Sequence, residues 1–306
     1  MGQSNLIYLV FGIVLLAAVL LDLGLLSKKG HAVPVRSALW QTALWVGLAL
    51  AFFAFLLVER GQVTAWEYLS AYLMEWSLSV DNIFVFILIF DSFRIKPIFY
   101  GRVLMVGILA AILLRVGFIT VGVGLVARWH WVLYIFGVIL IYTGVSMFRQ
   151  KKGNEEDVHE GRPYKLLKRV LPLTDHDGGG KWRITEGGRK KYTTLFVVVL
   201  LLAMTDIVFA LDSIPAVFGI TQEKLVIYTS NIFAVLGLRS LFFLLQGAAA
   251  RFSRLQQGIA VVLLFVGIKM LAEIWEIHLP AYISLLVILL CLGGAMLLSA
   301  RRPPTA

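Results

Sequence analysis

Two pairs of carboxylates interrupt long apolar stretches of this chain with the same spacing. Glu75 and Asp81 lie six residues apart in LMEWSLSVDNIFVFILIF, and Asp206 and Asp212 lie six residues apart in LAMTDIVFALDSIPAVF. An acidic side chain near the centre of a bilayer costs about 2.5–3.5 kcal/mol on insertion scales. Because four such residues occur in two matched segments, we interpret them as the lining of a site or path for a cation.

The spacing limits how one helix can present its pair. Six residues on a straight helix turn the second carboxylate by about 120° and move it about 9 Å along the axis. One regular helix therefore cannot direct both groups at one ion. Either each carboxylate meets a partner from the other segment, or the helix is broken between the two. The run DSIP at 212–215 places cap-forming residues before a proline and favours a break, and SVDN at 79–82 is a similar cluster without the proline.

The composition indicates a membrane protein with many spans. The 306 residues are 59% hydrophobic and 15% charged. A helix needs about 20 mostly apolar residues to cross a bilayer, and windows that meet this requirement recur along the chain. They are 5–26, 38–58, 68–90, 103–126, 131–148, 193–212 with a continuation to about 220, 226–246, 256–275 and 280–299. We therefore predict an all-α polytopic integral membrane protein with about nine transmembrane helices.

The distribution of basic residues predicts the topology. The net charge is +10, and alternate connections between the predicted spans carry 22 of the 28 Lys and Arg residues. Basic residues gather on cytoplasmic loops, so the N-terminus is expected outside and the C-terminus in the cytoplasm, with the chain in the bacterial cytoplasmic (inner) membrane. Because this alternation explains the excess of basic residues, we do not expect the protein to bind nucleic acid. The expected partner is the lipid bilayer.

The two acidic segments begin similar units. Each unit has an arginine after its acids, Arg115 in LLRVGFI and Arg239 in LGLRSLFF. A glycine follows each arginine at a similar distance, Gly144 after 29 residues and Gly267 after 28. Because each unit has an odd number of spans, three, the second unit crosses the membrane in the opposite orientation to the first. Inverted repeats of this kind are typical of transporters.

This pattern predicts the organisation of the whole chain. Two N-terminal transmembrane helices (1–66) precede a first three-helix repeat (67–148) and a cytoplasmic loop (149–192). A second three-helix repeat (193–276) and a C-terminal helix and tail (277–306) follow. Within the cytoplasmic loop, KWRITEGGRKKYTTL is typical of a short hairpin around Gly187 and Gly188. The run DHD at 175–177 is interpreted as a solvated turn rather than a metal cluster.

Three cations also lie within the predicted spans, namely Arg115, Arg239 and Lys269. Each would be costly without a partner, so we expect them to balance the charge of the acids. Asp22, near the cytoplasmic end of the first span, is a further acid that can face the lipid headgroups. The five acids exceed the three cations by two charges, a surplus that a divalent cation or protons would cancel.

The candidate ligands are all oxygen atoms. Besides the four carboxylates, the neutral side chains of Asn82, Ser213 and Asn231 are candidate ligands, or alternatively make hydrogen bonds between helices. Oxygen ligands suit hard ions such as Mn²⁺, Ca²⁺ and Mg²⁺. Neither Cys nor His lies near the acids, so a dedicated Zn²⁺ or Cu⁺ site is not expected. We expect no permanently bound cofactor, and a metal ion as substrate.

The chain resembles the TerC family of membrane proteins over nearly its whole length. EWSLSVDN at 75–82 and TDIVFALDSIPA at 205–216 are similar to the paired signatures of that family, and LLRVGFI, LGLRSLFF and GIKML follow in the family's order. The most similar branch is the Alx type, implicated in manganese export. The resemblance implies Mn²⁺ efflux with Glu75, Asp81, Asp206 and Asp212 as functional residues. One departure is Ala203, where many relatives carry a Glu.

The sequence therefore favours a secondary transporter that exports Mn²⁺ or a similar divalent ion from the cytoplasm. No GxxxxGK[ST] motif indicates ATP as the energy source, and protons are a hypothetical counter-ion. The alternative is a non-transporting scaffold whose ion network specifies helix packing and which assists metal loading or stress resistance through partner proteins. An enzyme is not expected, because neither an HExxH motif nor a paired nucleophile and base is present.

Overall fold

The computed structural model describes residues 11–13, 34–149, 162–174, 176–186, 188–246, 255–277, 279 and 281–300, and these are mostly helical. The backbone of Asp81 belongs to a helix, but its side chain lies outside this description. The helices are α2 (Val35–Glu59), α3 (Gln62–Ser92), α4 (Pro97–Arg128), α5 (Val132–Arg149), α6 (Arg162–Val170), α7 (Thr194–Phe218), α8 (Lys224–Leu236), α9 (Leu238–Leu245), α10 (Leu255–Ala272) and α11 (Ala281–Ala300).

Several of these helices are suited to a bilayer. Within the described residues, six stretches are long and apolar enough to cross a membrane, namely Val35–Glu59, Pro97–Arg128, Thr194–Phe218, Lys224–Leu245, Gln257–Trp275 and Tyr282–Ser299. The apolar helix Val132–Phe148 is shorter. α3 has 31 residues, which corresponds to ~46 Å. The predicted integral membrane, largely helical architecture is confirmed. The number nine stays a prediction, because the window 5–26 lies almost entirely outside the described residues.

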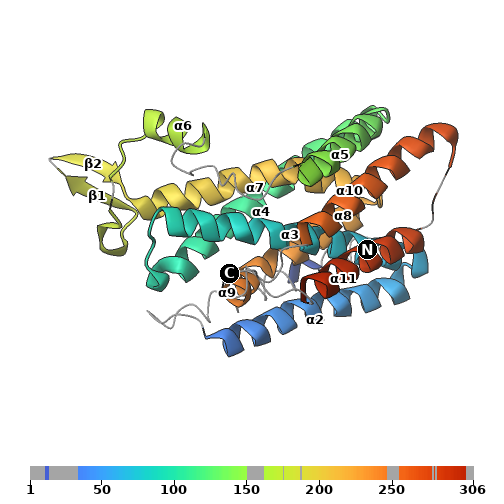
Figure 1. The fold of residues 1–306 in the computed structure, drawn as a ribbon, viewed down its shortest axis with the longest axis horizontal. Helices are drawn as coiled ribbons and strands as arrows, with labels where there is room; N and C mark the ends of the chain where they lie inside the picture. Colours follow the sequence, from blue (N-terminus) through green and yellow to red (C-terminus); the bar gives the residue numbers. More distant parts are fainter. Residues whose placement is uncertain are drawn as a thin grey trace.

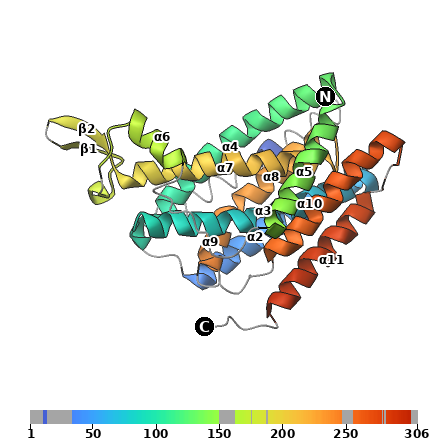
Figure 2. The same cartoon turned by 45° about the horizontal axis from the view of Figure 1, so that its top comes forward.

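The long helices pack in pairs within one bundle. α5 packs along α10, α4 along α7 and α3 along α8, while α3 also contacts α7. α2 and α11 pack against α3. Figures 1 and 2 show α3, α4 and α7 running side by side, with the strands at one end of the bundle. These contacts bring the helices that carry the acids, α3 and α7, into the centre of the bundle.

One predicted helix break is absent and another break was not foreseen. α7 runs without interruption from Thr194 to Phe218, so the break expected at 212–215 is wrong. Pro215 lies close to the end of α7, where its missing N–H costs a single helical hydrogen bond; its carbonyl still accepts a hydrogen bond from Gly219 N at 3.0 Å. The predicted span 226–246 corresponds to the apolar stretch Lys224–Leu245, within which Gly237 separates α8 from α9.

The crossing of α5 and α10 depends on glycines. A Cβ added to Gly267 of α10 would lie 2.7 Å from the carbonyl oxygen of Gly137 and 2.8 Å from a side-chain carbon of Ile141, both on α5. A Cβ at Gly144 would meet the carbonyl oxygen of Ala260 at 2.9 Å. Small residues allow transmembrane helices to approach closely. The backbones of α5 and α10 are therefore in direct contact at these positions.

We expect Gly267→Ala to destabilise the protein by about 1–3 kcal/mol, because the methyl group overpacks a site bounded by backbone. The unfolding temperature of the purified protein in detergent measures this effect. Gly117→Ala is the control, since nothing lies within 4 Å of its added Cβ and alanine favours a helix by about 1 kcal/mol over glycine. If Gly267→Ala were as stable as Gly117→Ala, the close approach of α5 and α10 would be contradicted.

A polar cap covers one end of the bundle. It comprises α6, a short 3₁₀ helix (Gly178–Gly180) and the antiparallel strands β1 (Arg183–Glu186) and β2 (Arg189–Tyr192). Arg183 lies opposite Tyr192, and Glu186 lies opposite Arg189, so the predicted hairpin is confirmed. Gly188 adopts φ +74°, a conformation that favours glycine. Gly187 lies outside the described residues.

The cap is attached to the start of α4 by charged side chains. Lys96 Nζ lies 2.8 Å from Asp177 Oδ2, and Arg102 Nη1 donates to the carbonyl of Gly180 at 2.8 Å. The guanidinium of Arg102 also lies 4.4 Å from the ring centre of Trp182. Asp177 Oδ1 accepts a hydrogen bond from Gly179 N. Residues 176–177 thus lead into the 3₁₀ helix, while Asp175 lies outside the described residues, so the solvated turn over 175–177 stays a prediction.

The hydrogen bond from Lys96, followed by that from Gly179, lowers the pKa of Asp177 below its usual value. A lowered carboxyl pKa stabilises the folded protein above the unfolded pKa of about 3.9, and this contribution is lost as the pH falls through the folded pKa. We expect Asp177→Asn to cost up to about 1 kcal/mol at pH 6, because Lys96 is exposed and Asp177 is only half-buried. Unfolding temperatures of both proteins should converge near pH 2–3. If the difference between the two unfolding temperatures stayed the same at low pH, the ionised carboxylate of Asp177 could not be its cause.

Candidate functional site

Arg115 of α4 is the centre of a buried polar cluster. Its Nη2 donates to Asp206 Oδ1 at 2.8 Å and its Nε donates to Asp206 Oδ2 at 3.3 Å. The same guanidinium forms an ion pair with Glu75 Oε1 through Nη1. Nη1 also donates to Asn231 Oδ1 at 3.2 Å and to Ser213 Oγ at 3.5 Å. One guanidinium thus joins α3, α4, α7 and α8.

The sequence explains how this cluster assembles. α3 and α7 are apolar helices whose acids can reach one another only if both face the bundle interior, and α4 lies along α7. Glu75 and Asp206 are 0% and 1% exposed, and Arg115 is 2% exposed. Buried ions require partners, and the two-pronged contact of Arg115 with Asp206 is the strongest form of such a pair. With both acids ionised, two carboxylates share one guanidinium and the cluster carries one net negative charge.

Glu75 has acceptor capacity that the surrounding protein does not use. Within the described part of the chain, Glu75 Oε2 accepts no hydrogen bond, while Oε1 contacts the guanidinium of Arg115 as an ion pair. The hydroxyl of Ser79, one turn further along α3, is also buried and likewise lacks a hydrogen-bond partner there. A buried polar group without a partner costs about 1–3 kcal/mol. The arrangement therefore fits a polar or cationic guest beside Glu75.

The other carboxylate of α7 faces a different helix. Asp212 is partly buried, and its Oδ1 accepts a hydrogen bond from Thr143 Oγ1 of α5 at 2.9 Å. This separation follows from the six-residue spacing on an unbroken helix, which turns the second group by about 120°. Glu75 and Asp206 instead contact the same guanidinium, that of Arg115, so one carboxylate from each segment reaches a common partner.

The remaining predicted residues are distributed as follows. Ser213 and Asn231 belong to the Arg115 cluster, and Asn82 is buried in α3. Arg239 is buried in α9. Lys269 is buried in α10, where its Nζ donates to Ser284 Oγ of α11 at 3.2 Å. Asp22 and the side chain of Asp81 lie outside the described part of the chain. Within that part, no three His, Cys, Asp or Glu residues are grouped closely enough to hold a metal ion by themselves.

A second polar cluster, at the opposite end from the cap, was missed by the sequence reasoning. Thr221 Oγ1 donates to Glu67 Oε2 at 2.6 Å, and Thr64 Oγ1 donates to Glu223 Oε2 at 3.2 Å. These bonds join the first turns of α3 to the connection between α7 and α8. The only sequence signal is that TAWE at 64–67 and TQE at 221–223 each place a threonine two or three residues before a glutamate at or near the start of a helix. The sequence does not show that each threonine bonds the glutamate of the other segment rather than the one in its own.

Comparison with known proteins agrees with these features. The model of the integral membrane protein TerC family matches residues 60–304. A protein of Myxococcus xanthus named "Uncharacterized membrane protein STKORF319" is 45% identical over 302 residues, which are 98% of this chain and 93% of that protein. No solved structure is significantly similar to this chain.

Two further relatives have a more specific name, "Putative membrane-bound redox modulator Alx". They come from Salmonella typhi and Escherichia coli (strain K12) and are 38% and 37% identical over 287 residues. The matches cover 91% of this chain and 88% and 89% of the two relatives. The family match spans every helix that contributes to the Arg115 cluster. The chain belongs to the integral membrane protein TerC family.

Proposed function

We propose that this protein exports a hard divalent cation, with Mn²⁺ as the leading substrate, from the cytoplasm through the site around Glu75, Asp206 and Arg115. One observation carries the proposal. Glu75 is a fully buried carboxylate whose Oε2 accepts no hydrogen bond from the described residues, and a second buried carboxylate lies on the same guanidinium. A cation that binds Glu75 would give Oε2 a partner and offset the net negative charge; a divalent ion would leave the cluster with one positive charge.

The side chains around the guanidinium offer a ligand set for a hard ion. Glu75 and Asp206 supply carboxylate oxygens, Ser79 and Ser213 supply hydroxyls, and Asn231 supplies an amide oxygen. Oxygen ligands of this kind suit Mn²⁺, Mg²⁺ and Ca²⁺. The preference for Mn²⁺ rests on the family resemblance, and the other two ions are the alternatives that a transport assay distinguishes.

The guanidinium of Arg115 would compete with the metal ion for the same oxygen ligands. This guanidinium contacts Asp206, Glu75 and Asn231, which are groups that a metal ion would also bind. A divalent cation and a guanidinium repel each other, so an entering ion must displace Arg115 or share its ligands. When the ion leaves, Arg115 can return to the carboxylates. This exchange avoids an empty, strongly negative cavity, which would hold the ion too tightly for release.

The pairing of helices supports an inverted repeat of 67–148 and 193–276. If α3, α4 and α5 correspond to α7, α8 with α9, and α10, then the contact of α4 with α7 has α8 with α3 as its counterpart. Because α5 and α10 are counterparts of each other, the repeat maps the contact between them onto itself. The glycines that follow the two arginines, Gly144 and Gly267, both lie at this contact. Such symmetry suits alternating access to a site at the repeat interface, with protons as the proposed counter-ion.

The ends of the bundle support a cytoplasmic cap. The basic α6 and hairpin lie at one end, and a belt of exposed tryptophans, Trp66, Trp129, Trp131 and Trp275, marks the other. Tryptophan is enriched at membrane interfaces, and cytoplasmic loops carry excess Lys and Arg. We therefore orient the chain in the bacterial inner membrane with its N-terminus outside and its C-terminus inside.

The name of the relatives, a membrane-bound redox modulator, requires no dithiol chemistry in this chain. Its single cysteine, Cys291 of α11, cannot form an intrachain disulfide. Control of a redox-active metal ion by transport would alter the redox state of a cell without a redox group in the transporter. The proposal is thus compatible with that name while resting on the buried carboxylates.

A scaffold is the second candidate, and one observation favours it. Arg115 ties four helices together, as a purely structural ion network would. Metal content of cells separates the two functions. Cells that produce the protein should accumulate less Mn²⁺ than cells that do not, and Glu75→Gln at equal membrane abundance should restore the higher level. A Glu75→Gln variant that lowers Mn²⁺ as well as the original protein would favour the scaffold and contradict transport through this site.

A further inference from the structure

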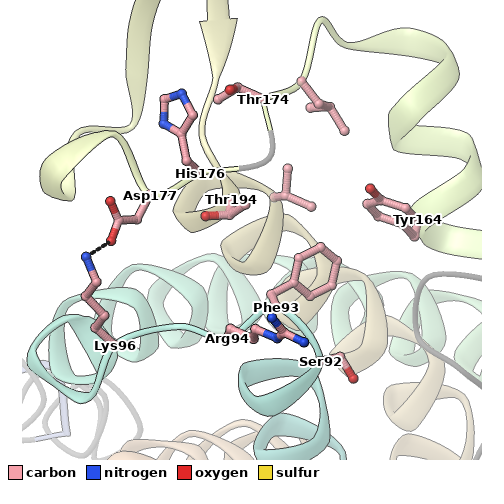
Figure 3. A pocket seen from close by; sticks show the side chains of 11 residues that line it. Ser92, Phe93, Arg94, Lys96, Tyr164, Thr174, His176, Asp177 and Thr194 are labelled. Carbon is pink, nitrogen blue, oxygen red and sulfur yellow. Dashed lines mark ion pairs between the residues drawn. The ribbon is translucent and has the colours of Figure 1, made fainter.

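A polar pocket lies where the turn between α3 and α4 meets the cap (Figure 3). Its volume is about 380 Å³, within the range of about 300–1,000 Å³ that small-molecule sites occupy. The polar side chains that line it include Arg94, Lys96, Tyr164, His176, Asp177 and Thr194. This pocket is separate from the Arg115 cluster, because α3 carries Glu75 several turns away from Arg94.

The backbone of Arg94 is held in a conformation that favours glycine. Arg94 has φ +48°, immediately after α3. Ile95 N donates to Phe90 O at 3.0 Å and Arg94 N donates to Asp91 O at 3.0 Å, the pattern of a helix end whose left-handed residue is usually glycine. A non-glycine residue in this region costs on the order of 1 kcal/mol, and such strain gathers at functional sites. The presence of an arginine at this strained position indicates that its side chain has a function.

The charges around the pocket favour an anion. Asp177 is the sole acid among the lining residues, and its carboxylate already binds Lys96 and the Gly179 amide. Arg94 has no ion pair within the described residues, so the lining carries one net positive charge with His176 neutral. Figure 3 shows Lys96 turned to Asp177, with Arg94 near Phe93 and Ser92.

Two long helices also begin at this pocket. α4 starts after Lys96 and α7 starts at Thr194, and in neither case does the N-cap side chain bond the first amides. The hydroxyl of Thr193 is engaged elsewhere, donating to the carbonyl of Lys181 at 2.6 Å. The N-terminus of a helix carries partial positive charge, although Thr194 N here already donates to His176 O and Phe196 N to Thr193 O. Both helix ends therefore add to the field that Arg94 creates.

We propose that this pocket binds a phosphate group, with Arg94 as its main ligand and with His176 and the Thr194 hydroxyl as further donors. Arginine provides the planar pair of N–H groups that suits phosphate oxygens. The phosphate can belong to an anionic lipid headgroup or to a small soluble compound. Phe93 packs edge-on against Tyr164 of α6 with ring centres 5.3 Å apart, so the cap already contacts the end of α3 beside the pocket, and a phosphate bound to Arg94, His176 and Thr194 would add a second link between them.

The test uses the full-length protein and the substitution Arg94→Gly. Glycine relieves the strain at this position, so the variant should fold and unfold at the same temperature as the original protein or higher when no phosphate is present. One arm measures unfolding temperature in detergent as inorganic phosphate is added. The other arm compares nanodiscs of phosphatidylcholine with nanodiscs that also contain phosphatidylglycerol. Arg189→Gln is the control, because it removes an exposed charge on β2 that does not line the pocket.

We expect phosphate, phosphatidylglycerol or both to raise the unfolding temperature of the original protein and of Arg189→Gln. Arg94→Gly should need at least about tenfold more of the same probe for the same shift, a loss typical of one charged contact. The probe that acts through Arg94 identifies the source of the phosphate. The proposal is overturned if neither probe stabilises the original protein, or if Arg94→Gly responds to the probes as strongly as Arg189→Gln.

Discussion

Glu75→Gln and Asp206→Asn should each reduce Mn²⁺ efflux by about 100-fold or more, because even groups that only support metal ligands contribute 10–100-fold to metal affinity. Both substitutions keep the size of the side chain and remove its charge. Export is measured as loss of Mn²⁺ from preloaded cells at matched protein abundance. Asp91→Asn is the control, since Asp91 is an exposed acid at the C-terminal end of the same helix, and it should leave efflux unchanged.

Stability separates a lost substrate site from a lost fold. Glu75→Gln leaves Arg115 with the two-pronged contact to Asp206, a neutral pair, so the unfolding temperature should be unchanged or higher. The scaffold function makes the opposite prediction, in which stability falls while transport is absent throughout. Efflux that persists in both Glu75→Gln and Asp206→Asn would place the transport site elsewhere in the chain.

Arg115→Met should have the largest effect on folding. Removal of one partner from a buried ion pair costs about 3–5 kcal/mol, and here two carboxylates would be left without their shared guanidinium. The unfolding temperature and the amount of protein in the membrane report the loss. Arg128→Met on the same helix is the control, because Arg128 is exposed and should change stability by less than about 1 kcal/mol.

The origin of that loss can be checked by a compensating variant. Arg115→Met combined with Glu75→Gln and Asp206→Asn has no charge left in the cluster, and neutral replacement of a buried ion network is often tolerated. We expect this triple variant to recover most of the stability without recovering Mn²⁺ efflux. A triple variant as unstable as Arg115→Met alone would show that the contribution of Arg115 is packing rather than charge.

The sequence predicted where helices and the hairpin occur better than it predicted where helices end and which helices pack together. Long apolar runs such as 103–126 predict helices because the bilayer requires about 20 apolar residues with satisfied backbones. The hairpin before α7 was also predictable, since Gly187-Gly188 lies between residues suited to short strands. The proline at 215 misled the prediction of a break, because its effect depends on how near it lies to the helix end. Gly237 gave a weaker signal and yet divides α8 from α9.

For the candidate site, the sequence indicated the types of group but not their contacts. A buried arginine near buried acids predicts charge pairing, and Arg115 does pair with two acids. The spacing of Asp206 and Asp212 gives the angle between them, but it cannot say that Asp212 meets Thr143 of α5. The left-handed conformation of Arg94 has no sequence signal at all, because an arginine in that position does not resemble a turn residue.

Uptake of Mn²⁺ into inverted membrane vesicles tests the central claim most directly, because export from the cytoplasm then appears as accumulation inside the vesicle. Vesicles that contain the original protein should take up Mn²⁺, faster with an acidic interior if protons are the counter-ion, and vesicles with an equal amount of folded Glu75→Gln should show only background uptake. Equal Mn²⁺ uptake by the two proteins, or no uptake above that of vesicles without the protein, would contradict export of a divalent cation through the buried carboxylates.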